Sequence, residues 1–179
     1  MQLEHRAVFE VRVGAGRTLY GIAAPFNRSA DIGGMFTESI APGAFAKSLA
    51  SNSDVLALAD HRSDALLGRT RSRTLRLSES AAGLEYALDL PQTSLGNDLL
   101  ELAKRGDLGG ISIGFVADDE AWTNKTTRQL RSVTLHEVSV IRGHAAYGEG
   151  TTIALRSRDK NAPIGAVSPE ARRRFLDML

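Results

Sequence analysis

Cysteine is absent from the 179-residue chain. Its absence excludes disulfide bonds, thiolate zinc sites and cysteine nucleophiles, and with them a small secreted domain stapled by disulfides. Long apolar runs are lacking as well, because no stretch approaches the roughly 20 apolar residues that a membrane-spanning helix needs. The first residues contain no apolar signal-peptide core. We therefore expect a soluble protein inside the cell.

An excess of charge of either sign is also missing. The formal net charge is +1, so no overall field favours nucleic acid or an anionic membrane surface as a partner. The four histidines show neither HxxxH nor HExxH spacing, and "GAG" at 14–16 precedes no helical pattern. The sequence therefore predicts no metal, no cofactor, no membrane association and no specific nucleic-acid site.

Alternating apolar residues predict seven or eight short strands and two internal helices. Strands are expected at 8–13, 19–26, 54–61, 73–80, 83–90, 111–118 and 131–142, and helices at 40–51 and 97–110. The second helix has Asn97 as its expected N-cap and Gly106 after its last turn. Residues 118–130 are polar and are expected to form a loop. Since strands and helices do not alternate regularly, we predict an α+β, mainly β fold: a mostly antiparallel β-barrel with surrounding helices.

The composition changes near residue 156, where the strand patterns end. We therefore predict one domain over 1–156, which is long enough to bury a core. Residues 157–179 are expected to form a linker and a short C-terminal helix, with Ser168 as its cap and Pro169 at its first position.

One predicted strand has an unusual face. In "DLGGISIGF" (107–115), Ile111, Ile113 and Phe115 alternate as a buried face should, but Ser112 and Gly114 leave the other face without bulk. Glycines before a serine let backbone N–H groups approach a substrate closely, and a serine becomes a nucleophile when a base accepts its proton. The alternative is a small-residue strand packed under a helix, with Ser112 simply hydrogen-bonded.

A histidine and a carboxylate are the candidate partners of this serine. His61 ends the apolar stretch "LALADH", where it is either a base facing a cleft or a surface residue paired with Asp60 or Asp64. Glu137, in "VTLHEVSVI", is expensive to bury unpaired, so it either meets a cation such as an imidazolium or faces solvent from an edge strand. His136 competes for the same role, because strict alternation lets only one of the two point at a given site.

Several stretches occur in an order that resembles the prohead proteases of tailed bacteriophages, which are capsid-maturation serine peptidases. They are "YGIAAPFN" (20–27), "FTESIAPGAFAKSL" (36–49), "VLALADHRSDALLGRT" (55–70), "GLEYALDL" (83–90), "LLELAKRGDLGGISIGF" (99–115) and "LHEVSVIRGHAAY" (135–147). The resemblance covers residues 8–156. It implies a fold similar to the herpesvirus assemblins, a β-barrel ringed by helices.

The resemblance also implies roles for particular residues. Ser112 corresponds to the nucleophile, His61 to the base and Glu137 to the acidic member, although the assemblins use a second histidine there and His136 is adjacent. Backbone groups at Arg142 and Gly143 would then lie where the oxyanion is held. The family usually has Pro-Ala where this chain has His144-Ala145, so His144 departs from the pattern. The other histidine, His5, lies in the N-terminal segment and is not expected to matter.

By the same resemblance, the substrates would be the major capsid protein precursor, the scaffold and the protease itself, inside the assembling prohead in the host cytoplasm. The tail after residue 156 is then a candidate for self-removal or for tethering to scaffold. The analogy with the assemblins, which dimerise, suggests a homodimer. The competing hypotheses are a catalytically inactive scaffold or assembly protein of the capsid, and a barrel that binds a small ligand.

Overall fold

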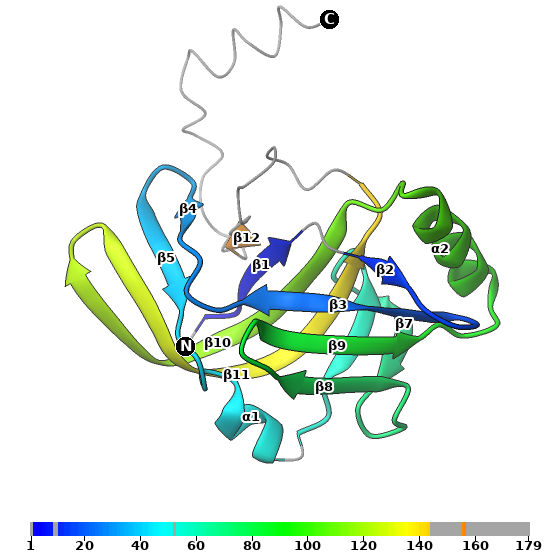
Figure 1. The fold of residues 1–179 in the computed structure, drawn as a ribbon, viewed down its shortest axis with the longest axis horizontal. Coiled ribbons are helices and arrows are strands. Elements are labelled where there is room, and N and C mark those ends of the chain that lie inside the picture. The colour runs from blue at the N-terminus through cyan, green and yellow to red at the C-terminus, as the bar shows by residue number, and fades with distance from the viewer. Residues whose placement is uncertain (1, 9–10, 52, 144–154, 157–179) are drawn as a thin grey trace, which may run out of the picture.

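The computed structural model describes residues 2–8, 11–51, 53–143 and the backbone of 155–156. This part of the chain contains twelve strands and two helices (Figure 1). The elements are β1 (Glu4–Val8), β2 (Arg12–Val13), β3 (Thr18–Pro25), β4 (Ala30–Ile32), β5 (Phe36–Ile40), α1 (Ala46–Ala50), β6 (Leu56–Ala59), β7 (Arg62–Arg69), β8 (Leu75–Glu79), β9 (Gly83–Asp89), α2 (Ser94–Arg105), β10 (Gly110–Asn124), β11 (Thr127–Ile141) and β12 (Leu155–Arg156). The predicted mainly β, α+β class is confirmed.

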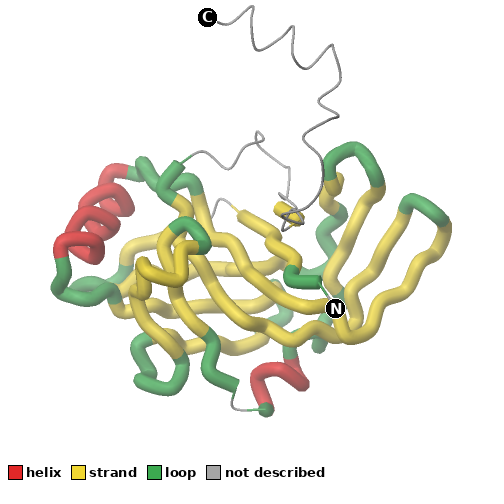
Figure 2. Tube along the Cα trace, turned by 180° about the vertical axis from the view of Figure 1, so that it is seen from behind, coloured by secondary structure: helices red, strands yellow, loops and turns green. Residues whose placement is uncertain are grey.

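The strands form two sheets, which Figure 2 shows from behind. The larger sheet has the order β12-β1-β10-β11-β5-β4, and β6 joins it beside β11 and carries β7 on its other edge. The smaller sheet has the order β2-β3-β9-β8. All strand pairs are antiparallel except those of β11 with β5 and with β6. The described pairings therefore leave two open sheets, and the predicted closed barrel is not confirmed.

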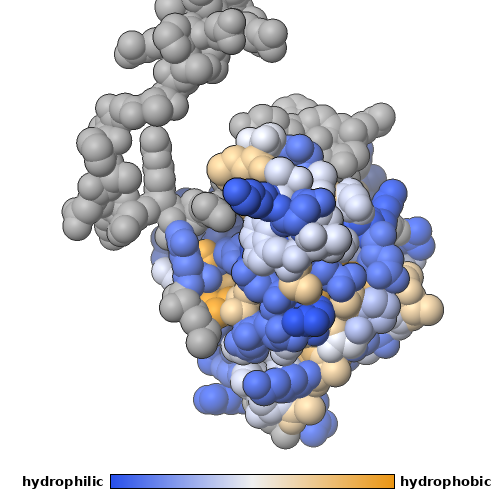
Figure 3. Space-filling model, turned by 90° about the vertical axis from the view of Figure 1, so that its left-hand side faces the viewer, coloured by the Kyte–Doolittle hydropathy of each residue, from blue (hydrophilic) through white to orange (hydrophobic). Residues whose placement is uncertain are grey.

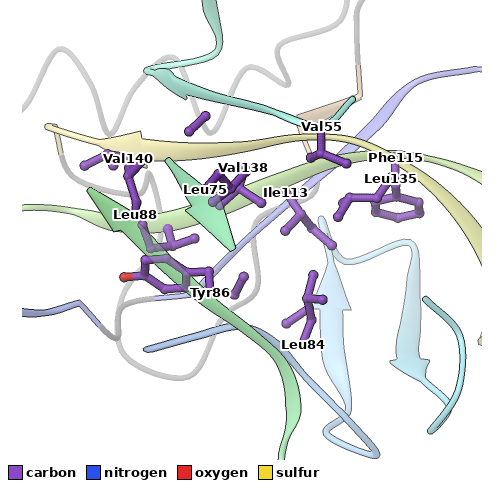
Figure 4. Close-up of a cluster of buried hydrophobic side chains, with 14 of the residues drawn as sticks. Val55, Leu75, Leu84, Tyr86, Leu88, Ile113, Phe115, Leu135, Val138 and Val140 are labelled. Carbon is purple, nitrogen blue, oxygen red and sulfur yellow. The ribbon is translucent and has the colours of Figure 1, made fainter. Parts of the chain in front are cut away.

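The core lies between the two sheets (Figure 4). Leu84 and Leu88 of β9 contribute to it from the smaller sheet, and both are fully buried. Ile113 and Phe115 of β10 contribute from the larger sheet, as their alternation predicts. Burying a side chain of this size stabilises the fold by roughly 1.5–3 kcal/mol. Because one face of β10 is committed to this core, its other face is left for Ser112 and Gly114.

The segment 118–130 was expected to be a loop, and this prediction is wrong. β10 continues through Asn124 and β11 begins at Thr127, so only residues 125–126 form the turn of a long hairpin. The polar composition that suggested a loop belongs largely to the end of β10, where most side chains are exposed. Exposure of both faces removes the alternation by which a strand is recognised.

The helices are shorter than predicted, and α2 begins earlier. Thr93, not Asn97, is its N-cap, and the Thr93 side chain accepts a hydrogen bond from the Gly96 N–H at 3.2 Å. Gly106 ends the helix with a φ of 76°, as a C-terminal glycine is expected to do. The first helix spans only Ala46–Ala50, because the residues from Pro42 to Phe45 form a turn before it.

Four strands were not predicted: β4, β5, β7 and β12. β7 begins with three exposed polar residues, and its burial pattern alternates only weakly. The predicted strand at 8–13 lies instead at Glu4–Val8 and Arg12–Val13. The difference at β1 matters, because it makes His5 part of the large sheet.

A network of buried charges fixes β1 against the rest of this sheet. Arg6 donates to Glu38 at 2.8 Å, and Arg128 donates to Glu4 at 2.7 Å and to Glu38 at 2.9 Å. Arg6, Glu38 and Arg128 are each at least 95% buried. Removing one member of such a network leaves a buried charge without its partner, which is strongly destabilising.

The side of the molecule at the left of Figure 1 is mostly hydrophilic (Figure 3). The free ends of β10 and β11 lie on this side, where Trp122 packs edge-on against Phe36 with ring centroids 5.2 Å apart. Neither helix in the described part of the chain has the length and apolar character needed to cross a membrane.

Candidate active site

Neighbouring strands of the large sheet place small and polar residues in two adjacent rows. Ser112 of β10 pairs with Ala7 of β1 on one side and with Ser139 of β11 on the other. Two residues along β10, Gly114 pairs with His5 and with Glu137 in the same way. Paired residues on adjacent strands point to the same face of a sheet, so both rows lie on the face of β10 that is turned away from the core.

Gly114 explains why this face lacks bulk. A Cβ atom at Gly114 would lie 2.5 Å from Cγ of Glu137 and 3.1 Å from Cε1 of His5. The space above the glycine is therefore occupied by two side chains from the neighbouring strands. Close packing therefore accounts for the glycine at position 114, but the packed groups are ionisable side chains of neighbouring strands and not the helix that the alternative assumed.

A tight turn brings His61 to the same place. Asp60 and His61 form the two-residue connection between β6 and β7, and their φ angles are 50° and 59°. Two positive φ values in succession are typical of a type I′ hairpin turn, and they are uncommon for histidine. The Asp60 carboxylate accepts hydrogen bonds from N–H of Arg142 at 2.8 Å and from its Nε at 2.6 Å. Asp60 thus ties the turn to the end of β11.

His61 and Glu137 are joined by a hydrogen bond between Nδ1 and Oε1. Nε2, the other ring nitrogen of His61, is buried and has no hydrogen-bond partner within the described residues. A carboxylate on Nδ1 favours the tautomer in which Nδ1 carries the proton and Nε2 has a free lone pair. A histidine held in this way can accept a proton at Nε2.

Two serines flank this pair. Ser139 is fully buried, and its Oγ donates to Oε1 of Glu137 at 3.2 Å. Ser112 lies directly opposite Ser139 and is 1% exposed. Side chains of directly opposite residues are roughly 5 Å apart at Cβ. The sequence pointed to Ser112 and gave no role to Ser139. The spacing of two residues between Glu137 and Ser139 could have indicated that both lie on the same face of the strand.

The environment keeps Glu137 ionised. Burial opposes the charged form, but the hydrogen bond from His61, the two neighbouring imidazoles and the hydrogen bond from Ser139 hold the pKa of the Glu137 carboxyl below its ordinary value. The carboxylate is therefore available at neutral pH to orient an imidazole and to stabilise its protonated form.

A bulge decides between Glu137 and its neighbour His136. Gly114 pairs with Glu137, but the next residue, Phe115, pairs with Leu135, so β10 has no residue opposite His136. The extra residue breaks the alternation of β11, and His136 is exposed. Of the two candidates, the structure brings Glu137 to His61.

His5 was not expected at this site. Its ring meets the ring of His61 edge to face, with centroids 4.0 Å apart. Its Nδ1 lies 3.5 Å from Oε1 of Glu137. The predicted strand at 8–13 left His5 outside the sheet. If "EHRAV" is taken as a strand, its period of two residues puts His5 and Ala7 on the same face of the sheet.

The predicted oxyanion region lies at the end of β11. The Arg142 N–H already donates to Asp60, so in this arrangement it does not also bind an oxyanion. Gly143 follows, with open space where its Cβ would be. His144 and the predicted tail at 157–179 lie outside the described residues.

His5, His61 and Glu137 each offer one potential ligand atom, and these atoms lie within 4.8 Å of one another. No other such group occurs among the residues that the structure describes. Two of the three, His61 and Glu137, are also joined as a hydrogen-bonded acid–base pair.

Replacing Gly114 with alanine tests whether the space above it is needed. The added methyl group must push Glu137 away from His61, because the clash is with Cγ, close to the backbone. We expect the downfield proton NMR signal of the His61–Glu137 hydrogen bond to be lost, and a destabilisation of about 1–3 kcal/mol.

Gly14→Ala is the matched control, since its Cβ would lie 3.3 Å from the flexible side chain of Tyr20. The control should keep the signal. A Gly114→Ala protein that also keeps it would show that the contacts around Gly114 do not position Glu137.

Comparison with known proteins identifies a protein family that matches this chain. The family model described as "Caudovirus prohead serine protease" matches residues 4–163. No curated protein and no solved structure matches the chain. The matched range includes all of the residues discussed above, from His5 to Gly143.

Proposed function

Since the chain belongs to the caudovirus prohead serine protease family, we propose that it is a serine endopeptidase in which Ser112, His61 and Glu137 act together. The observation that carries this proposal is the His61–Glu137 hydrogen bond on the sheet face that carries Ser112, which leaves the buried Nε2 of His61 without a partner among the described residues.

In the proposed mechanism, Nε2 of His61 accepts the Ser112 proton as Oγ attacks a peptide carbonyl carbon. The C–N bond then breaks, and the same proton passes from His61 to the leaving amine. In the second half of the reaction, His61 accepts a proton from water as the water oxygen attacks the acyl carbon. The bond from that carbon to Ser112 Oγ then breaks, and His61 returns the proton to Oγ. Glu137 holds Nδ1–H throughout and stabilises the imidazolium. The Gly143 N–H is the proposed donor to the oxyanion.

The proposed substrates are capsid precursor proteins: the major capsid protein precursor with its scaffold segment, any separate scaffold, and the protease itself. The family match supports this substrate class and supports activity inside the assembling prohead. The alternative of a catalytically inactive assembly protein lacks a comparable observation, because such a protein has no need of an oriented histidine beside a buried carboxylate.

Covalent labelling tests the proposal directly. A fluorophosphonate reacts with a serine only when a base activates it, so we expect one adduct per chain, which peptide mass spectrometry locates at Ser112. Because Ser112 is 1% exposed, part of the surrounding structure must move before the probe or a peptide reaches it, and we expect slow labelling. An adduct on another residue, or none after prolonged incubation under conditions that support cleavage, would contradict the assignment.

A further inference from the structure

We propose that His5 is a positioning residue of this site, which holds the Glu137 carboxylate in its orientation toward His61. This inference rests on the function proposed above. It concerns a residue that the comparison with the family does not single out, and that the sequence alone placed outside the sheet.

The first support is the geometry around Oε1 of Glu137. Three side chains surround this one oxygen: Nδ1 of His61 in a hydrogen bond, Oγ of Ser139 at 3.2 Å and Nδ1 of His5 at 3.5 Å. His5 is 12% exposed and Glu137 is 13% exposed. Nδ1 of His5 has no hydrogen-bond partner among the described residues. A small shift of the His5 ring toward Oε1 of Glu137 would form a hydrogen bond between them.

The second support is the contact between the two imidazoles. The His5 and His61 rings meet at an interplanar angle of 67°. An edge-to-face contact of this kind is a favoured arrangement for two rings. It restricts the rotation of the His61 ring, whose orientation decides where Nε2 points.

The third support is how firmly β1 is fixed. Glu4 and Arg6, the neighbours of His5, belong to the buried charge network with Glu38 and Arg128. Arg6 also donates from Nη1 to the carbonyl oxygen of His5 at 2.8 Å. The backbone of His5 is therefore held by ion pairs, while its side chain is directed to the site.

Burial favours the neutral form of His5 and lowers its pKa. The titratable groups that act on it are His61 and Glu137 from the facing elements and Arg6 from its own strand. Burial and the neighbouring His61 lower the pKa of His5 below its usual value, and Glu137 offsets this only in part. A neutral His5 can direct an N–H at Glu137 without placing a second positive charge beside His61.

Two variants separate the hydrogen-bonding role from simple packing. His5→Asn keeps an N–H donor near the position of Nδ1, while His5→Phe keeps a ring against His61 and removes the donor. We expect His5→Phe to lower kcat by roughly 10- to 100-fold, with KM changed less than twofold. His5→Asn should recover most of the activity. His136→Asn, an exposed neighbour of Glu137, is the matched control and should behave as the wild type.

A second measurement does not depend on cleavage. In Ser112→Ala protein labelled with ¹³C, the titration of the Glu137 carboxyl is followed by NMR with and without His5→Phe. Because Nδ1 of His5 lies 3.5 Å from Oε1 of Glu137, and an N–H directed at a carboxylate favours its charged form, we expect His5→Phe to raise the pKa of Glu137 and His5→Asn to raise it less. A merely structural role would leave this pKa unchanged in a folded variant.

The outcomes distinguish this inference from the proposed function. If Ser112→Ala still cleaves precursor, the proposed function fails. If Ser112→Ala is inactive while His5→Phe keeps its kcat, or lowers kcat without moving the Glu137 titration, only the role of His5 is overturned. A lower kcat, a raised Glu137 pKa and recovery in His5→Asn together support it.

Discussion

The Ser112→Ala variant is expected to lose peptide-bond cleavage by at least about 10³-fold, since without the nucleophile only binding and oxyanion stabilisation remain. The assay is incubation of purified chain with the matching capsid precursor, read by mass spectrometry of the products. Removing one small hydroxyl from β10 changes little else, because Ser112 lies on the face away from the core. The fold should therefore be kept, as circular dichroism can verify.

Ser139→Ala is the control that makes this result specific. Ser139 lies directly opposite Ser112 and is equally buried, but its hydroxyl donates to Glu137. Its loss removes one of several groups that hold the carboxylate, and we expect a reduction of roughly 10-fold or less. If Ser139→Ala were inactive and Ser112→Ala active, the two serines would exchange roles in the mechanism.

The Glu137→Gln variant is expected to lower kcat by roughly 10³- to 10⁴-fold, the size of effect seen when a catalytic carboxylate becomes an amide in such triads. Glutamine fits the space above Gly114, but it carries no negative charge to stabilise protonated His61 and does not select the tautomer. The measurement is steady-state cleavage of a peptide that spans a mapped cut site. His136→Gln, one residue away and exposed, should retain activity.

The same variant should change the dependence of stability on pH. The pKa of Glu137 is lower in the folded protein than its ordinary value, so this carboxylate stabilises the fold above its ordinary pKa. That contribution is lost as pH falls through the lowered pKa of the folded state. Denaturant unfolding at a series of acidic pH values should show a shallower loss of stability for Glu137→Gln than for the wild type.

Local patterns predicted much of the fold. The hairpin of β8 and β9, the strand β3 and the end of α2 at Gly106 lie within a few residues of their predicted positions, because each has its own alternation or turn residue. The hairpin from Asp118 to Leu130 was missed because most of its side chains are polar and those at the end of β10 are mostly exposed, so no apolar alternation marks the strands.

Some residues of the candidate site could likewise be predicted from local patterns, and others could not. Ser112 and Gly114 could be selected because a strand face without bulk is visible in one short stretch, and His61 and Glu137 could be selected as polar residues within apolar stretches. Which of His136 and Glu137 faces His61 depended on a bulge, and a bulge is a property of two paired strands. The placement of His5 in the site depended on the register of β1. This register is fixed by ion pairs of Glu4 and Arg6 with residues that are distant in the sequence.

The sequence by itself determined the strand-rich class, the absence of cysteine chemistry, and the small face of β10, since these follow from composition and from period-2 alternation within single segments. Only the tertiary structure decided that two sheets stay open around one core, and that His61 meets Glu137 with His5 beside them. These side chains come from β1, the β6–β7 turn and β11, and their convergence depends on long-range pairing that no local pattern encodes.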